Sequence, residues 1–253
     1  MLKIAAIIAI HGREAITLKS VIRLRQQSHP LSQIILVGET PAERALAEMT
    51  DSTFIEHPNT PLGAKWQAGI NYVRSLGVDG ILIIGSDDWL TPNWVKKMVS
   101  EAKRGYELIG KKSIYFLHFG NSDKKLLRWN GYPEGDIRFG EPIGAGRVFM
   151  NELLNRMDWQ LFPAYLNGGL DKASYFLTLA HQGNIKIVEE EDVQAMDLKS
   201  IYWTNKWSYD QIAAARGVTH IANTNDFLQK YFPDTEEWIK LFKNFHEKST
   251  PQN

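Results

Sequence analysis

The chain has 253 residues, of which 43% are hydrophobic and 23% are charged, as in an ordinary globular protein. Its 29 basic and 29 acidic residues give a formal net charge of zero, so the overall charge does not demand a polyanionic partner such as nucleic acid. The chain contains no cysteine, which excludes disulfides and thiolate-bound zinc. This favours a reducing compartment, and we expect a cytoplasmic protein.

The N-terminal segment is apolar over residues 4–10 and then turns polar at His11, Gly12 and Arg13. The apolar run lacks the small-residue cleavage site of a signal peptide. A continuous apolar run of this length predicts a strand that is covered on both faces. No apolar run in the sequence is long enough for a membrane-spanning helix, so we expect no integral membrane segment.

The first hundred residues alternate between strand and helix patterns. The predicted strands are residues 4–10, residues 33–37, Thr53–Glu56 and residues 80–84. The predicted helices are the segment from about Glu14, Pro41–Met49, residues 62–76 and residues 92–103. This alternation predicts a parallel sheet with helices on its faces. Ligands bind beyond the carboxyl ends of the strands in such sheets, so the residues just after each strand are the candidates for a site.

The alternation ends after about residue 105. The later predicted strands are residues 113–119, residues 126–129 and Ile185–Val188, and the later predicted helices are residues 151–157 and residues 171–181. We therefore predict one α/β domain over residues 1–253. It consists of a parallel half at 1–104, a half with a small antiparallel region at 105–222, and a helical C-terminal tail at 223–253.

Two adjacent carboxylates follow the predicted strand at residues 80–84. They are Asp87 and Asp88, which come directly after Gly85 and Ser86. Carboxylates at the end of a strand can hold a hard divalent cation. Such a cation can bridge a diphosphate and neutralise charge on a leaving phosphate. The alternative is that both carboxylates cap the turn and the helix that follows it.

Four motifs occur in an order that resembles glycosyltransferase family 2, which has the GT-A fold. They are His11-Gly12-Arg13 after the first strand, Glu39 after the second, Gly63-x-Lys65-x-Gln67-x-Gly69, and Gly85-Ser86-Asp87-Asp88. The third is similar to the family's Gly-x-Lys-x-Asn-x-Gly helix, with Gln67 in place of Asn. The fourth is similar to its Asp-x-Asp region. The resemblance covers the first hundred residues.

The resemblance implies a hexosyltransferase with a mostly parallel, Rossmann-like sheet. We expect a UDP-sugar donor, Mg²⁺ or Mn²⁺ as the metal, and inversion at the anomeric carbon. Residues 1–104 would hold the donor and residues 105–222 the acceptor. The residues expected to bind the donor are His11, Gly12, Arg13, Glu39, Lys65, Gln67, Ser86, Asp87, Asp88, Arg147 and Lys199.

One carboxylate of the Asp-x-Asp motif is missing, because its first position falls on Gly85 or Ser86. Each lost anionic ligand lowers the affinity for a metal. We expect Asp87 to be the principal metal ligand. Asp88 would be either a second metal ligand or an acceptor of a hydrogen bond from a sugar hydroxyl.

Three cationic residues are candidates for contacts with phosphate or sugar. Lys65 lies near the start of a predicted helix, where backbone N–H groups favour anions, and the alternative is a solvated surface lysine. Arg147 follows three small residues, and its alternative is an internal ion pair. Lys199 lies within residues 196–207, whose mixture of polar and aromatic side chains suits a loop that closes near the diphosphate.

By the same resemblance, Asp171 is the catalytic base, because it opens the predicted helix at residues 171–181. Sugar transfer passes through an oxocarbenium-like state. A carboxylate opposite the leaving group can take the proton of the acceptor hydroxyl as the new bond forms. The alternative is that Asp171 caps the N-terminus of its helix.

Two other classes of function stay open. A nucleotidyltransferase of similar fold would carry a glycine-rich phosphate loop after the first strand, and His11-Gly12-Arg13 is sparse for that. The other class is a non-catalytic protein that binds nucleotides or carbohydrates.

The acceptor is expected to be a glycan or another hydroxyl compound in a bacterium or a phage-infected host cell. The alternative acceptor is the hydroxymethylated bases of phage DNA. Residues 124–129 mix cations with an aromatic side chain, which suits a nucleic acid. The zero net charge argues against it.

Overall fold

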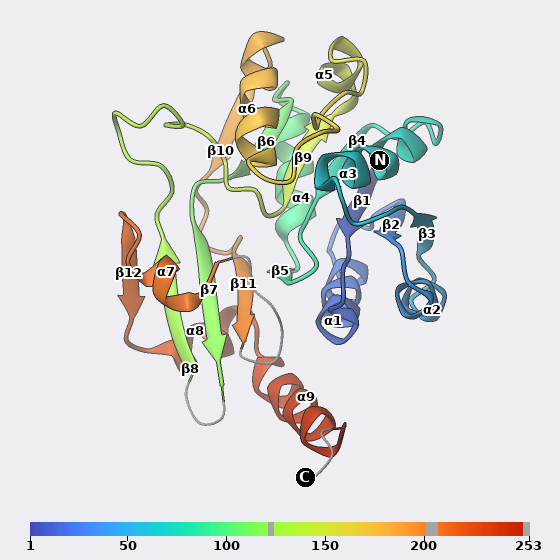
Figure 1. Ribbon diagram of the computed structural model, residues 1–253. Coiled ribbons are helices and arrows are strands. Elements are labelled where there is room, and N and C mark those ends of the chain that lie inside the picture. Colours follow the sequence, from blue (N-terminus) through green and yellow to red (C-terminus); the bar gives the residue numbers. More distant parts are fainter. Residues whose placement is uncertain (121–123, 201–206, 250–253) are drawn as a thin grey trace.

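The computed structural model describes residues 1–120, 124–200 and 207–249, with side chains through residue 243, and these residues contain two β-sheets (Figure 1). The first sheet has seven strands in the order β10-β6-β9-β4-β1-β2-β3. These strands are β1 (Ile4–Ala9), β2 (Gln33–Gly38), β3 (Thr53–Glu56), β4 (Gly80–Ile83), β6 (Leu108–Lys111), β9 (Arg147–Met150) and β10 (Ile185–Val188).

The first sheet is mostly parallel, as predicted. Strands β4, β1, β2 and β3 run parallel to one another, and β10 runs parallel to β6. Only β9 is antiparallel to both of its neighbours, β4 and β6. Strands β1, β2 and β4 are continuous apolar runs because helices cover them on both faces.

The second sheet has five strands in the order β12-β8-β7-β11-β5. They are β5 (Asp88–Leu90), β7 (Ile114–Phe119), β8 (Lys124–Trp129), β11 (Ala195–Ser200) and β12 (Val218–Ile221). Only β7 and β11 are parallel in this sheet. It is the small antiparallel region that we expected, but β5, β11 and β12 were not predicted. The predicted strand 80–84 ends at Ile83, and the next strand along the chain, β5, starts at Asp88.

Helices cover both faces of the first sheet, on which two separate apolar cores form. They are α1 (Glu14–Arg25), α2 (Pro41–Met49), α3 (Leu62–Arg74), α4 (Trp94–Ala102), α5 (Asn151–Arg156) and α6 (Leu170–Ala180). Side chains of α1, α2 and α4 share one core, and side chains of α3, α5 and α6 share the other. No helix in the described part of the chain combines the length and apolar character that crossing a bilayer requires.

The C-terminal segments pack on the second sheet. They are α7 (Tyr209–Ala213), α8 (Thr224–Tyr231) and α9 (Thr235–Ser249). Buried aromatic side chains of α8 and α9 share a third core with Trp89 of β5 and Phe119 of β7. Asp234, between the two helices, also forms ion pairs with Lys19 and Arg23 of α1. The predicted helical tail is therefore anchored to both the second sheet and α1.

Candidate functional site

The turn between β4 and β5 carries two of the predicted metal ligands. The backbone N–H of Gly85 donates to Oδ2 of Asp88 over 2.9 Å, which closes the turn. A Cβ atom on Gly85 would lie 2.6 Å from that oxygen, so glycine allows the carboxylate to fold back over the turn. The capping alternative is thus correct for one oxygen of Asp88. It does not exclude a ligand at the other oxygen.

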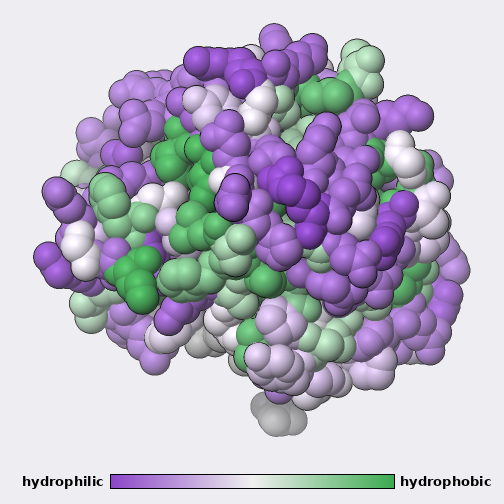
Figure 2. All heavy atoms as spheres, turned by 90° about the horizontal axis from the view of Figure 1, so that it is seen from above, coloured by the Kyte–Doolittle hydropathy of each residue, from purple (hydrophilic) through white to green (hydrophobic). Residues whose placement is uncertain are grey.

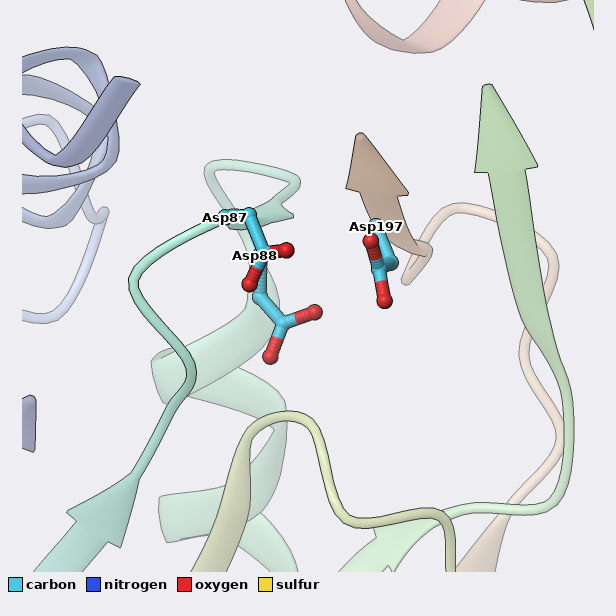
Figure 3. A group of neighbouring side chains, drawn as sticks. All are labelled: Asp87, Asp88 and Asp197. Carbon is cyan, nitrogen blue, oxygen red and sulfur yellow. The ribbon is translucent and has the colours of Figure 1, made fainter. Parts of the chain in front are cut away.

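A third carboxylate reaches this turn from a distant part of the chain. Strand β11 pairs antiparallel with β5, and the register places Asp197 opposite Asp88. Asp87, Asp88 and Asp197 each bring an oxygen within 4.8 Å of the other two (Figure 3). Asp197 was expected only as one polar residue of the closing loop at 196–207 near the diphosphate, and not as a metal ligand. The pairing of β5 with β11 is what brings it to the acidic turn.

Two cations lie against this acidic cluster, which we define as Asp87, Asp88 and Asp197. Arg13 forms an ion pair with Oδ2 of Asp87. The ammonium of Lys199 lies 2.8 Å from Oδ2 of Asp197 and 3.8 Å from Oδ2 of Asp87. The other oxygen of Asp197, Oδ1, is buried and has no hydrogen-bond partner among the described residues. A buried acceptor without a partner is costly, and a bound cation would satisfy it.

The pKa values of Asp88 and Asp197 are shifted by burial and by the neighbouring charges. Burial, Asp197 and Asp87 raise the pKa of Asp88 well above its ordinary value. Burial is also the main cause that raises the pKa of Asp197 to about 7, although Lys199 opposes it. Burial alone would lower the pKa of Lys199, but Asp197 and Asp87 outweigh it and the pKa is raised. A divalent cation at the cluster would favour the ionised form of every carboxylate.

The loops after β1 and β2 lie together at the same edge of the sheet. Nδ1 of His11 lies 3.2 Å from Oε1 of Glu39. Glu43 joins the two loops, because its carboxylate accepts from the backbone N–H of Gly12 over 3.1 Å, of Glu39 over 2.7 Å and of Thr40 over 3.0 Å. Glu43 was not predicted from the sequence. The pattern that could have identified it is the capping box that Thr40 and Glu43 form at the start of α2.

Lys65 and Gln67 are both buried. Lys65 is 0% exposed, so it is not the solvated surface lysine of the alternative. Its ammonium donates to the carbonyl oxygen of Ile10 and, over 3.1 Å, to Oδ1 of Asn59. The side-chain amide of Gln67 donates to the carbonyl oxygen of Trp159 over 2.6 Å and accepts from the N–H of Leu161 over 3.2 Å. Gln67 therefore has a structural role, and its contact with the donor stays a prediction.

Arg147 also differs from the donor-binding expectation. Its side chain is buried, and it forms an ion pair with Glu141 at 2.5 Å. It further donates to the carbonyl oxygen of Asp171 over 2.8 Å and to Oγ of Ser174 over 3.1 Å. The internal-ion-pair alternative is thus correct. Arg147 holds the first turn of α6 from beneath, and through it the backbone of Asp171.

Asp171 is exposed in the first turn of α6, and Gly169 is the N-cap, so the capping alternative is wrong for Asp171. Its carboxylate lies directly over Gly144, where a Cβ atom would come within 2.5–2.7 Å of three of its atoms. Gly146 of the same loop donates to the carbonyl oxygen of Ile83 over 2.9 Å. The loop thus connects the surroundings of Asp171 to the end of β4, where the acidic turn begins.

The face that carries α5 and α6 is mostly polar, with apolar side chains gathered on one part of it (Figure 2). Ile137 and Phe139, which precede β9, are 72% and 50% exposed. The hydroxyl of Tyr175 in α6 donates to the carbonyl oxygen of Phe139 over 3.0 Å, which ties this segment to the helix of Asp171. Of the predicted closing loop at 196–207, residues 201–206 lie outside the described residues.

Comparisons with known proteins agree with this architecture. A family model described as "Glycosyl transferase family 2" matches residues 5–160. No curated protein matches the chain significantly in sequence. The crystal structure of S. aureus TarS 1–349 in complex with UDP-GlcNAc has a TM-score of 0.57 at 13% identity, covering 85% of this chain and 61% of that one.

Two other solved structures are similar in the same way. TarS 1–349 in complex with UDP has a TM-score of 0.56 at 13% identity, covering 79% of this chain and 61% of that one. TarS 1–349 alone has a TM-score of 0.55 at 12% identity, covering 78% and 60%. The chain thus spans 60–61% of the length of these structures. At this identity the similarity shows a shared fold.

Proposed function

The chain belongs to glycosyl transferase family 2 and is a glycosyltransferase with a GT-A fold, and on this premise we propose that it uses a UDP-sugar and a divalent metal. The family decides against the nucleotidyltransferase and the non-catalytic binding protein. The proposed reaction transfers the sugar to an acceptor hydroxyl with inversion at the anomeric carbon. The observation that carries the proposal is the acidic cluster at the junction of the two sheets.

Asp87, Asp88 and Asp197 fit a divalent metal. Hard cations such as Mg²⁺ and Mn²⁺ prefer carboxylate oxygens, and Oδ1 of Asp197 is a buried acceptor without a partner among the described residues. Asp197 also compensates for the missing carboxylate of the Asp-x-Asp motif. When bound, the ion supplies positive charge to the diphosphate leaving group. Arg13 and Lys199 both lie beside Oδ2 of Asp87 and can donate hydrogen bonds to phosphate.

The paired loops after β1 and β2 support a nucleoside site. His11 and Glu39 offer polar atoms there, and Glu43 keeps both loops in place through their backbone N–H groups. A surface hollow beside them is lined by Glu39, Arg44 and Phe54. The similar TarS structures contain UDP or UDP-GlcNAc, which supports uridine as the nucleoside in this chain.

Asp171 is the proposed general base. Its carboxylate is exposed, Arg147 holds its backbone, and Gly144 leaves room for it beside the loop that leads to the acidic turn. A carboxylate in this position would accept the proton of the acceptor hydroxyl as the hydroxyl oxygen attacks the anomeric carbon. A single base opposite the leaving group gives inversion.

A panel of nucleotide sugars tests the donor. The chain would be incubated with UDP-, GDP-, dTDP- and CMP-sugars, with Mn²⁺, Mg²⁺ or chelator. We expect release of UDP only from UDP-sugars and only with metal, and loss of this release in Asp87→Asn. Equal release in chelator would contradict the metal, and release from another nucleotide would contradict the uridine donor.

We propose a glycan acceptor over modified DNA. The cations of β8 are partly engaged within the protein, because Lys124 forms an ion pair with Glu236 and Arg128 lies 5.8 Å from the ring centroid of Tyr115. A gel-shift titration with hydroxymethylated duplex DNA at low salt tests this choice. We expect no shift. A shift that weakens steeply with salt would support the DNA acceptor.

A further inference from the structure

We propose that Lys199 is a built-in counter-cation of the metal site, which neutralises Asp87 and Asp197 until a divalent ion binds the same carboxylates and then turns to the diphosphate of the donor. This inference rests on the proposed function for the identity of the diphosphate. It adds that binding of the metal and binding of the nucleotide favour each other, which the three carboxylates alone would not produce.

The position of the ammonium carries the proposal. Lys199 lies two residues after Asp197 on β11, so both side chains project from the same face of the strand. The Nζ atom is 2.8 Å from Oδ2 of Asp197 and 3.8 Å from Oδ2 of Asp87. The Lys199 side chain is only 7% exposed, so its ammonium is a buried part of the cluster and not a solvated surface charge.

A divalent ion at Oδ1 of Asp197 and at Asp87 would lie beside the ammonium and compete with it for the charge of the same two carboxylates. An ammonium donates hydrogen bonds and has no lone pair, so it cannot join the ligand shell of a metal. It would also repel a divalent ion at this distance. Arg13 differs from Lys199 because, among the described residues, it forms an ion pair only with Asp87, whereas Lys199 lies between two of the three carboxylates.

Lys199 can leave without unfolding the strand. Its four-carbon side chain is flexible and ends in a compact charge that needs no fixed hydrogen-bond geometry. The diphosphate of a nucleotide offers a new anionic partner beside the cluster. Binding of the nucleotide should therefore favour binding of the metal, and by linkage the metal should favour the nucleotide to the same degree.

Affinity for Mn²⁺, measured from the EPR signal of the free ion with and without UDP, tests the inference on the full chain. For the wild type we expect UDP to tighten Mn²⁺ binding by about tenfold or more. In Lys199→Met, Mn²⁺ alone should bind about tenfold tighter than in the wild type, and the gain from UDP should shrink to about twofold. Lys103→Met is the matched control, because it removes one exposed lysine charge at the end of α4.

The result that overturns the inference is a Lys199→Met protein that binds Mn²⁺ no more tightly than Lys103→Met. Lys199→Gln provides a second neutral side chain if the methionine variant does not fold, and Lys199→Arg keeps the charge and should bind Mn²⁺ as weakly as the wild type. The donor panel is measured separately, on the wild type. If the wild type turns over a UDP-sugar but Lys199→Met has unchanged Mn²⁺ affinity, only the counter-cation is refuted. If Lys199→Met binds Mn²⁺ more tightly but the wild type turns over no nucleotide sugar, only the proposed function is refuted.

Discussion

Asp171 is the residue on which the proposed chemistry depends most directly. Its carboxylate is exposed, and the contacts with Arg147 and Gly144 position the residue. The carboxylate oxygens, which would accept the proton, do not cap α6. We expect Asp171→Asn to lower kcat for transfer by about 10²–10⁴-fold, because an amide cannot accept the proton. The dissociation constant for UDP should stay unchanged, as measured by calorimetry.

The control for this variant is Asp158→Asn, which changes an exposed carboxylate after α5. It should keep the kcat of the wild type. Near-normal turnover in Asp171→Asn would show that another group accepts the proton.

Asp197 makes the stability of the protein depend on pH. Its pKa in the folded protein, about 7, lies above the ordinary value of 3.8, because burial disfavours the ionised form. The stabilising contribution of the protonated group is therefore full below about pH 4 and is lost as the pH rises through 7. Asp197→Asn removes this titration. The variant should therefore gain stability relative to the wild type as the pH rises. The difference in the free energy of unfolding, variant minus wild type, should be larger at pH 8 than at pH 4 by on the order of 2–4 kcal/mol.

Urea unfolding in chelator at the two pH values measures this difference. Asp192→Asn, which changes an exposed carboxylate just before β11, is the control and should show no such pH dependence. A constant difference between Asp197→Asn and the wild type from pH 4 to pH 8 would contradict the raised pKa.

At the scale of elements, α9 supports the acidic turn through aromatic contacts. Trp238 meets Trp89 edge-on with ring centroids 5.1 Å apart, and Trp89 directly follows Asp88. Trp238→Ala should therefore destabilise the protein by about 2–4 kcal/mol and weaken Mn²⁺ and UDP binding together. Leu241→Ala is the matched control on the same helix. Because Leu241 is 62% exposed, its loss should cost less than about 0.5 kcal/mol.

Thermal and urea unfolding give the stabilities of these two variants, and calorimetry gives their affinities. If Trp238→Ala lowers stability but leaves both affinities intact, the helix stabilises the third core without positioning the turn.

At the scale of the whole molecule, the acidic cluster joins the two sheets. Asp87 lies in the turn that leaves the first sheet, whereas Asp88 and Asp197 face each other across β5 and β11 of the second. A ligand that binds all three should therefore stabilise the whole fold. UDP and Mn²⁺ together, each at about 100 times its dissociation constant, should add about 5 kcal/mol to the free energy of unfolding, about 2.7 kcal/mol from each ligand.

Differential scanning calorimetry measures this effect as a rise in Tm. Chelator should abolish most of the rise, and Mn²⁺ without UDP should produce less of it. A full rise with UDP in chelator would show that the nucleotide binds independently of the metal.

Local sequence patterns were sufficient to predict the parallel half and its turns. Continuous apolar runs mark β1, β2 and β4, and Pro41 marks the start of α2, because these signals depend on residues close together in the chain. For the same reason, the position of Asp87 and Asp88 after a buried strand was predictable. The family resemblance rested on these local motifs, and the match over residues 5–160 confirmed it.

Which polar residues meet depends on contacts between distant parts of the chain. Strands β5, β6 and β9 have three or four residues, and pairing with distant segments stabilises them, so no local period reveals them. Asp197 entered the site through such a pairing. Gln67 and Arg147 have partners that no local pattern predicted, because distant backbone groups bind the side chain of Gln67 and Glu141 pairs with Arg147. The role of a buried polar side chain depends on its partners in space, and these are set by the whole fold.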